Sequence, residues 1–366
     1  MTNTLWPADR VAELAVLLRG FRPGKWTEAD LSQGAVAQGW EWSAGELGPI
    51  LHAGRPFGEG QLLPVEDHMD IHVTTEEYTG LHFPLGEVEG GVREQVEAFR
   101  EMGRALRERL GEPNVIGSDD PDDPLHGSAP GWGAPFLRWR GRANSLELRV
   151  SGEGDPVLSL LPTSPAEGRY RYDREHGDGL VGGFLGVSLT GDIAGMTIAG
   201  ITRGDDWKGY ARRLVDVLRT MPAELTALGF ERSFGLHGDI PGEGGPWVFQ
   251  LALGEEVELG LDEAAADIMK RSPEMPDPEE LGWTEATEAR HLQEEIAYLA
   301  PSYRYDEVNA VRLAMLVLET AEALGIASPE GLSLTDNGGR IPNPGGDGPH
   351  TDYRISDYGL AVTENP

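Results

Sequence analysis

The fold is decided by the stretch "VREQVEAFREMGRALRERLGEP", residues 92–113, in which an apolar residue recurs every three or four positions among charges. This spacing places the apolar residues on one face of a helix. Gly111 and Pro113 follow the last of them and are typical of a helix end. We predict an amphipathic helix with one buried stripe, made of Val92, Val96, Phe99, Gly103, Leu106 and Leu110.

A second stretch of the same type, "KGYARRLVDVLRTMPAELTALGF", occupies residues 208–230. Tyr210, Leu214 and Val217 repeat the helical phase of the first three apolar positions of the earlier helix. The parallel fails at Pro222, which lies inside the second helix, and at Glu224, where the first helix has Leu106. We therefore predict that one structural unit occurs twice and that the second copy has diverged.

Alternating or apolar runs flank both helices and predict β-strands. The expected fold class is α+β: two related units, each a mostly antiparallel sheet packed by helices on one face. The predicted units are residues 1–165, residues 179–335 and a mostly irregular tail at 336–366. The predicted strands are residues 61–65, 68–74, 78–85, 136–141, 145–152 and 156–163 in the first unit, and 183–192, 195–201, 247–253 and 257–263 in the second.

Further helices are expected at both ends of the chain. The opening segment has Pro7 at a first helical turn, and a second helix begins at Thr27, a favourable N-cap, with Asp30 at the capping-box position. Residues 286–300 and 306–325 predict two helices that cover the second sheet. The segment 332–341 contains a glycine-rich turn and is interpreted as a hairpin.

The composition limits the function classes. With 62 Asp and Glu against 30 Lys and Arg, the formal net charge is −32, which disfavours nucleic acid and anionic membrane surfaces as partners. An acidic surface suits solubility, a bound cation or a basic protein partner. The absence of cysteine excludes disulfides and thiolate chemistry. No signal peptide or membrane-spanning run is recognised, so we expect a cytoplasmic protein.

One strand pattern suggests a metal site. If residues 68–74 form a strand, His68, Asp70 and His72 project from one face, and two imidazoles with a carboxylate are suitable ligands for a transition metal. A solvated polar face explains the same pattern. No catalytic motif is recognised elsewhere, so the sequence predicts no enzyme and no cofactor, with a metal-dependent enzyme as the alternative.

A second candidate is a surface for a protein partner. The loop "SDDPDDP", residues 118–124, is the densest local negative charge and precedes Trp132. Aromatic residues anchor interfaces and acidic rims attract basic partners, so the loop and Trp132 predict such a surface. A solvated loop is the simpler interpretation. The residues concerned are Asp119, Asp120, Asp122, Asp123 and Trp132.

The first half of the chain also resembles a known group of proteins. The order of four stretches over residues 5–163 is similar to that in uncharacterised actinobacterial domains found around polymorphic-toxin systems. The four are "ADRVAELAVLLRGF", "WTEADLSQGAVAQGWEW", "REQVEAFREMGRALRERLGEP" and "LRWRGRANSLELRV". The resemblance implies an acidic cytoplasmic immunity protein that blocks a basic secreted toxin without a cofactor, and it supplies no catalytic residues. A chaperone for a secreted protein and a structural or regulatory protein remain alternatives, and the oligomeric state stays open.

Overall fold

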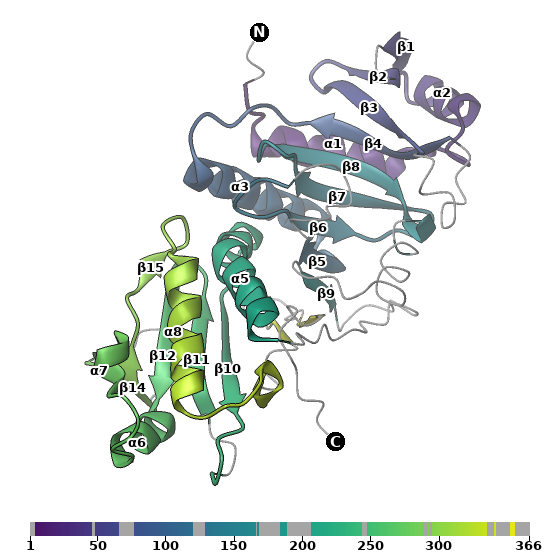
Figure 1. Ribbon diagram of the computed structural model, residues 1–366. Coiled ribbons are helices and arrows are strands. Elements are labelled where there is room, and N and C mark those ends of the chain that lie inside the picture. Colours follow the sequence, from purple (N-terminus) through teal and green to yellow (C-terminus); the bar gives the residue numbers. More distant parts are fainter. Residues whose placement is uncertain are drawn as a thin grey trace.

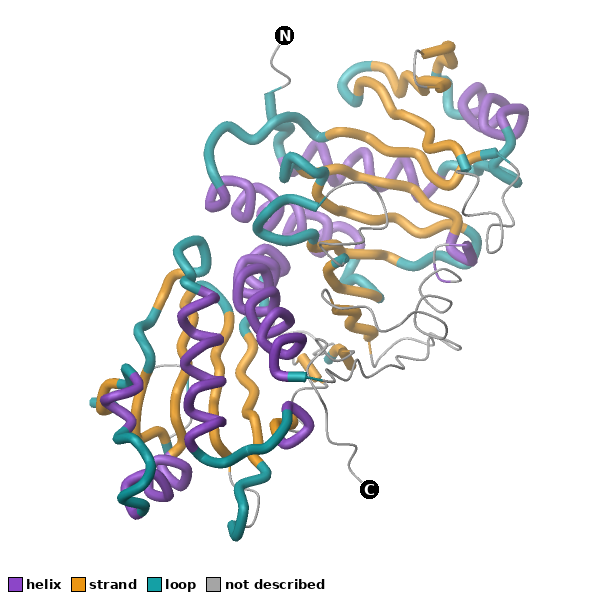
Figure 2. Tube along the Cα trace, viewed as in Figure 1, coloured by secondary structure: helices purple, strands orange, loops and turns teal. Residues whose placement is uncertain are grey.

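The computed structural model describes residues 4–45, 48–65, 77–119, 129–165, 167, 184–188, 206–243, 247–287, 292, 295–334, 340–341 and 352–355. Within these ranges the chain forms two antiparallel sheets, each covered by helices, as Figures 1 and 2 show. The predicted α+β class is confirmed. The two sheets are consistent with two units, and the elements that join them determine where a functional site can lie.

The first sheet has the strand order β1-β2-β3-β4-β8-β7-β6-β5-β9-β18-β17, with every neighbouring pair antiparallel. Helices α1 (Ala8–Gly20) and α3 (Val92–Leu110) lie side by side on one face of it (Figure 1). The strands are β1 (Glu41–Gly45), β2 (Gly48–Gly54), β3 (Gly58–Pro64), β4 (Tyr78–Pro84), β5 (Val115–Ser118), β6 (Pro135–Trp139), β7 (Asn144–Val150), β8 (Pro156–Pro162), β9 (Phe184–Ser188), β17 (Arg340–Ile341) and β18 (Tyr353–Ile355).

The helices of the first unit follow the predicted local signals. On α3 the stripe of Val96, Phe99, Gly103 and Leu106 is buried. Gly103 lets the helix approach the sheet, because a Cβ there would lie 2.9 Å from Leu137 Cδ1. This close packing is the reason a residue of low helix propensity occupies the middle of the buried stripe.

The second helix, α2 (Glu28–Ala37), begins at the predicted N-cap. Thr27 Oγ1 accepts a hydrogen bond from the Asp30 N–H at 3.2 Å. The Asp30 carboxylate in turn accepts from the Lys25 N–H at 2.8 Å, so it fixes the preceding turn and does not complete a capping box.

The second sheet has the order β13-β14-β12-β11-β10-β16, and β15 pairs with β12 outside this path. Helices α5 (Trp207–Leu228) and α8 (Ala310–Ala323) pack on each other and lie over one face (Figure 1). The remaining elements are β10 (Arg232–Gly238), β11 (Trp247–Leu253), β12 (Glu256–Asp262), α6 (Glu263–Arg271), α7 (Pro278–Leu281), β13 (Thr284–Glu285), β14 (Ile296–Leu299), β15 (Tyr303–Arg304) and β16 (Leu332–Leu334).

Several predictions about the second unit are wrong. Strand β9, expected in the second sheet, pairs with β5 in the first, and β18 from the C-terminal tail pairs with β9. The two ends of the hairpin predicted over 332–341 pair elsewhere, β16 with β10 and β17 with β18, and residues 335–339 lie outside the described residues. The helix predicted over 286–300 is wrong at residues 296–299, which form β14, and residues 288–291 and 293–294 lie outside the described residues. Tyr298 is buried opposite Leu261 of β12, a pairing partner that helical spacing does not reveal.

Helix α5 joins the two sheets. It contacts α3 and β6 of the first unit as well as α8 and β11 of the second, and it lies between the two sheets in Figure 1. Tyr210, Leu214 and Val217, the positions predicted from the helical phase, are all buried. The buried residues of both units form one continuous hydrophobic cluster. The junction around α5 is therefore a packed interface.

Candidate functional site

The predicted site residues fall partly outside the described residues. His68, Asp70 and His72, together with Asp120, Asp122 and Asp123, lie in the segments 66–76 and 120–128, which the structure does not describe. Among the residues it does describe, no group of three His, Asp or Glu side chains could hold a metal ion. The proposed metal site therefore stays a prediction.

Asp119 is not part of an exposed acidic surface, contrary to the prediction. It continues β5 by one residue, with its N–H bonded to Ala134 O at 3.1 Å, and the residue is only 4 % exposed. Its carboxylate accepts from Arg149 Nη2 at 2.7 Å. A buried guanidinium requires a counter-charge nearby. Asp119 provides that counter-charge for Arg149 inside the protein.

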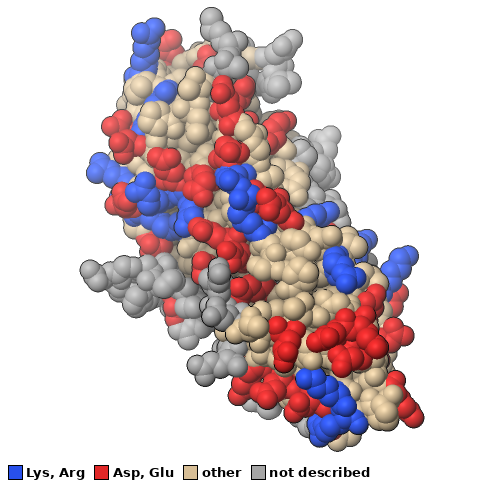
Figure 3. Space-filling view, turned by 90° about the vertical axis from the view of Figure 1, so that its left-hand side faces the viewer, with Lys and Arg blue, Asp and Glu red and all other residues tan. Residues whose placement is uncertain are grey.

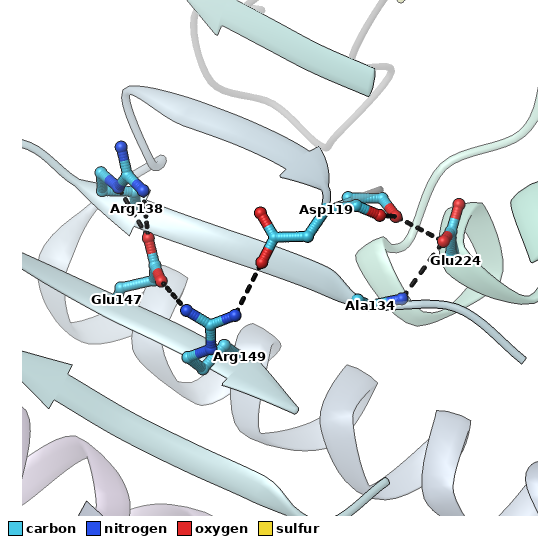
Figure 4. Close-up of polar contacts among 7 residues, drawn as sticks. Asp119, Ala134, Arg138, Glu147, Arg149 and Glu224 are labelled. Atoms are coloured by element: carbon cyan, nitrogen blue, oxygen red, sulfur yellow. Dashed lines mark hydrogen bonds and ion pairs between the residues drawn. The ribbon is translucent and has the colours of Figure 1, made fainter. Parts of the chain in front are cut away.

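Asp119 belongs to a buried network of charges on the first sheet (Figure 4). Arg149 also donates to Glu147 at 3.3 Å, and Glu147 accepts from Arg138 at 2.6 Å. Burial raises the pKa of the Glu147 carboxyl, and the Arg138 guanidinium opposes that rise. Two cations and two carboxylates thus compensate each other inside the protein, which indicates a structural role.

The network extends into a polar row across four strands. The register places His82 of β4 opposite Ser159 of β8, Ser159 opposite Glu147 of β7, and Glu147 opposite Arg138 of β6. Because side chains alternate along a strand and Leu148 faces α3, this row lies on the face opposite α3. Burial, with a smaller effect of Arg149, lowers the pKa of His82 to about 3, so its imidazole is neutral at physiological pH.

Beside this network, Glu224 of α5 reaches into the first unit (Figure 4). Its carboxylate accepts hydrogen bonds from Ser118 Oγ and from the Ala134 N–H, the latter at 3.2 Å. Burial raises the pKa of Glu224 to about 7, because these neutral donors compensate the lost hydration only in part. Gly133 leaves room for it: the backbone φ is +126°, and a Cβ would lie 2.3 Å from Glu224 Oε1. Glu224 therefore links the two units.

An open cleft of about 360 Å³ lies at the same junction. Trp132 forms one wall and is 5 % exposed, so this residue, expected at the surface, is buried. Its indole N–H donates to Gln95 Oε1 at 2.8 Å, and Gln95 Nε2 donates to Glu153 O at 2.7 Å. This chain of hydrogen bonds fixes the orientation of the wall.

The opposite wall comes from the second unit. Tyr305 and Asp306 line the cleft after β15, and Arg219 lines it from α5. Arg219 pairs with Asp216 on its own helix at 2.8 Å, whereas Asp306 pairs with Arg304 and, across the junction, with Arg93 at 3.4 Å. Burial, then the nearby carboxylates of Asp306 and other acidic residues, raise the pKa of Tyr305 to about 12.

The second unit also carries an acidic face. Residues 254–330 contain 19 Asp and Glu against five Lys and Arg, a net charge of −14 in that segment. The elements α6 and α7, which lie on the left of Figure 1, face the viewer in Figure 3, where groups of acidic side chains gather on the lower half around a smaller group of Lys and Arg. The acidic face comprises the exposed residues Glu263, Asp267, Glu274, Asp277, Glu279, Glu280 and Glu285.

Comparisons with known proteins found no matching family model, no matching curated protein and no matching solved structure. In the described part of the chain, no helix is both long and apolar enough to cross a membrane. The acidic face and the junction cleft are the features of the described residues that bear on function.

Proposed function

We propose that this chain is an acidic, cytoplasmic binding protein that neutralises a basic protein partner, as an immunity protein neutralises a secreted toxin. The observation that carries the proposal is the acidic face, where seven exposed carboxylates lie on and around α6, α7 and β13. The resemblance of residues 5–163 to domains found around polymorphic-toxin systems supports the same class of role.

The physical basis is electrostatic complementarity. Proteins that act on nucleic acids present clustered Lys and Arg to the phosphate backbone. A surface of carboxylates matches such a cluster, accelerates association and disfavours acidic competitors. The net charge of −32 extends this field beyond the acidic face itself.

Affinity capture from the native host, with the full chain as bait at about 50 mM and about 500 mM salt, tests the proposal. We expect one basic protein to be retained at low salt and weakened at high salt. The captured protein, assayed alone and with the bait, should lose its toxic activity on binding. A partner held in an unfolded state would favour the chaperone alternative, and the absence of any basic partner would contradict the proposal.

A matched pair of variants localises the surface. Replacing Glu279, Glu280 and Glu285 with Lys changes the net charge from −32 to −26 and should slow association about tenfold. The control changes the net charge by the same amount through lysine at three exposed carboxylates of the first unit, Glu13, Glu41 and Glu101. Equal effects of the two triple variants would show that total charge matters and that the acidic face does not.

A further inference from the structure

We propose that the junction cleft binds a basic side chain, arginine or lysine, presented by the protein partner. This inference rests on the proposed function, because it names the part of that partner that enters the cleft. The cleft of about 360 Å³ lies near the lower end of the range for small-ligand sites, a size suited to one long side chain.

Two aromatic residues provide the first requirement for such a site. Trp132 and Tyr305 are 5 % and 6 % exposed, and they line the cleft from the first and the second unit respectively. Trp132 is held by Gln95 and cannot rotate freely without losing that hydrogen bond. A guanidinium or ammonium group is attracted to the face of such rings, most strongly to that of tryptophan.

The second requirement is a negative potential. Asp306 and Glu153 line the cleft, and Glu97 and Glu255 contribute, with Asp306, to raising the pKa of the Tyr305 hydroxyl. Arg304 opposes that rise but does not reverse it. Glu153 and Asp306 face the cleft from the two units, and Glu97 and Glu255 lie close enough to act on Tyr305, so a cation in the cleft would be stabilised by more than one carboxylate.

Arginine side chains also surround the cleft. The carboxylates that pair with them determine how much positive charge they add to the cleft. Arg219 is engaged by Asp216 on α5 at 2.8 Å, and Arg100 is engaged by Glu255 at 2.7 Å. Arg93 pairs with Asp306 only at 3.4 Å. Asp306 is also engaged by Arg304 at 2.8 Å, so the long Arg93 contact is the one that an incoming guanidinium can replace, while Arg304 keeps its own.

The third observation is a hydrogen-bonding group on the cleft wall. Tyr305 lines the cleft, and its hydroxyl makes no hydrogen bond with the residues that the structure describes. The hydroxyl oxygen can therefore accept a hydrogen bond from a guanidinium or ammonium donor. Tyr305 thus offers a specific contact to a basic side chain in the cleft.

A peptide titration tests the cleft independently of any natural partner. The full chain, labelled with 5-fluorotryptophan, contains nine tryptophans, and Trp132→Phe identifies the Trp132 signal in the fluorine NMR spectrum. The probe is the peptide acetyl-Gly-Arg-Gly-amide, and the controls carry citrulline or glutamate in place of arginine. We expect the arginine peptide to move the Trp132 signal saturably and the control peptides to leave it in place.

Two variants of cleft residues test whether the arginine peptide contacts Tyr305 and Asp306. Tyr305→Phe should weaken binding of the arginine peptide roughly three- to tenfold, the effect of one lost hydrogen bond. Asp306→Asn should weaken it at least as much, whereas Glu285→Gln on the acidic face should have no effect. Unchanged positions of the other tryptophan signals show that each variant is folded. The inference is overturned if the citrulline peptide binds as well as the arginine peptide, or if neither cleft variant weakens binding.

The experiments distinguish a wrong inference about the cleft from a wrong proposal about the function. A captured basic partner that binds Tyr305→Phe and Asp306→Asn as tightly as the wild type would contradict the cleft inference alone. An arginine peptide that binds in the cleft, with no basic partner captured at low salt, would contradict the proposed function alone.

Discussion

Replacement of Glu224 by Gln should make the protein more stable at alkaline pH. The Glu224 carboxyl is buried, accepts hydrogen bonds from neutral donors, and has a pKa of about 7 where an ordinary glutamate has 4.5. At 1.36 kcal/mol per pKa unit, this difference corresponds to roughly 3 kcal/mol of unfolding free energy.

The sign follows from the protons bound in each state. Between pH 4.5 and about 7 the folded protein binds more protons at Glu224 than the unfolded chain does. This contribution to stability is complete below pH 4.5, is lost as the pH rises through about 7, and stays lost above it. A glutamine does not titrate, so the variant lacks this decline.

The amide should fit the site. Its oxygen can accept from Ser118 and Ala134 as the carboxylate does. Its NH₂ group can donate to the Thr220 hydroxyl oxygen, because the Thr220 proton is already donated to Asp216 O at 3.1 Å. The gain at pH 8 should therefore approach the full magnitude of roughly 3 kcal/mol.

Urea unfolding of the wild type and of Glu224→Gln at pH 5, 6, 7 and 8 measures the effect. The difference in midpoint should be small at pH 5 and grow in favour of the variant up to pH 8. Glu101→Gln, on the exposed side of α3, serves as the control and should follow the wild type at every pH. Parallel curves for the wild type and Glu224→Gln would refute the assignment of a raised pKa to this carboxyl.

Two further substitutions, each with a control, test the buried charge network of the first sheet and the packing of Gly133 against Glu224. Arg149→Met removes the guanidinium that pairs with the buried Asp119 and leaves Glu147 with Arg138 alone, so it should cost about 3–5 kcal/mol in urea unfolding. Arg104→Met, in an exposed helix pair, should cost less than about 0.5 kcal/mol. Gly133→Ala forces a Cβ to within 2.3 Å of the Glu224 carboxyl at a φ of +126° and should lower the stability by about 2 kcal/mol or more. Gly131→Ala has no atom within 4 Å of the added carbon and should be nearly neutral; equal costs at the two glycines would contradict the steric argument.

The helices that the sequence predicts correctly share a strong local signal. The segments now seen as α3 and α5 have apolar residues at helical spacing, and α2 has a clear N-cap at Thr27. Periodicity and capping are properties of neighbouring residues, so they can be recognised without knowing what the helix packs against.

The strands that were missed contain glycines or are very short. Strand β5 has four residues, and its Gly117 is required because a Cβ there would lie 2.7 Å from the Phe136 ring. Strand β10 contains Gly235 and Gly238. Glycine in sequence indicates a turn or bulge, and only the ring or strand that packs against it reveals the reason for its presence.

The cleft could be predicted only in part. The sequence predicts Trp132 as a residue that binds a partner, but its neighbours in the cleft come from separate segments: α3, the turn after β7, α5 and the segment after β15. Gln95 and Tyr305 carry no motif that links them to Trp132. Their proximity depends on how α5 joins the two sheets, which is a long-range property of the fold.

Glu224 departs from the repeated helical pattern, and this departure indicates the junction between the two units. The order of a helix followed by an antiparallel meander occurs in α3-β5-β6-β7 and again in α5-β10-β11-β12. In α3 the buried stripe meets its own sheet and Leu106 is apolar, whereas α5 also packs on the first unit, where Glu224 accepts a hydrogen bond from Ser118. A polar residue at a position that the similarity to α3 predicts to be apolar therefore marks the place where α5 contacts the first unit.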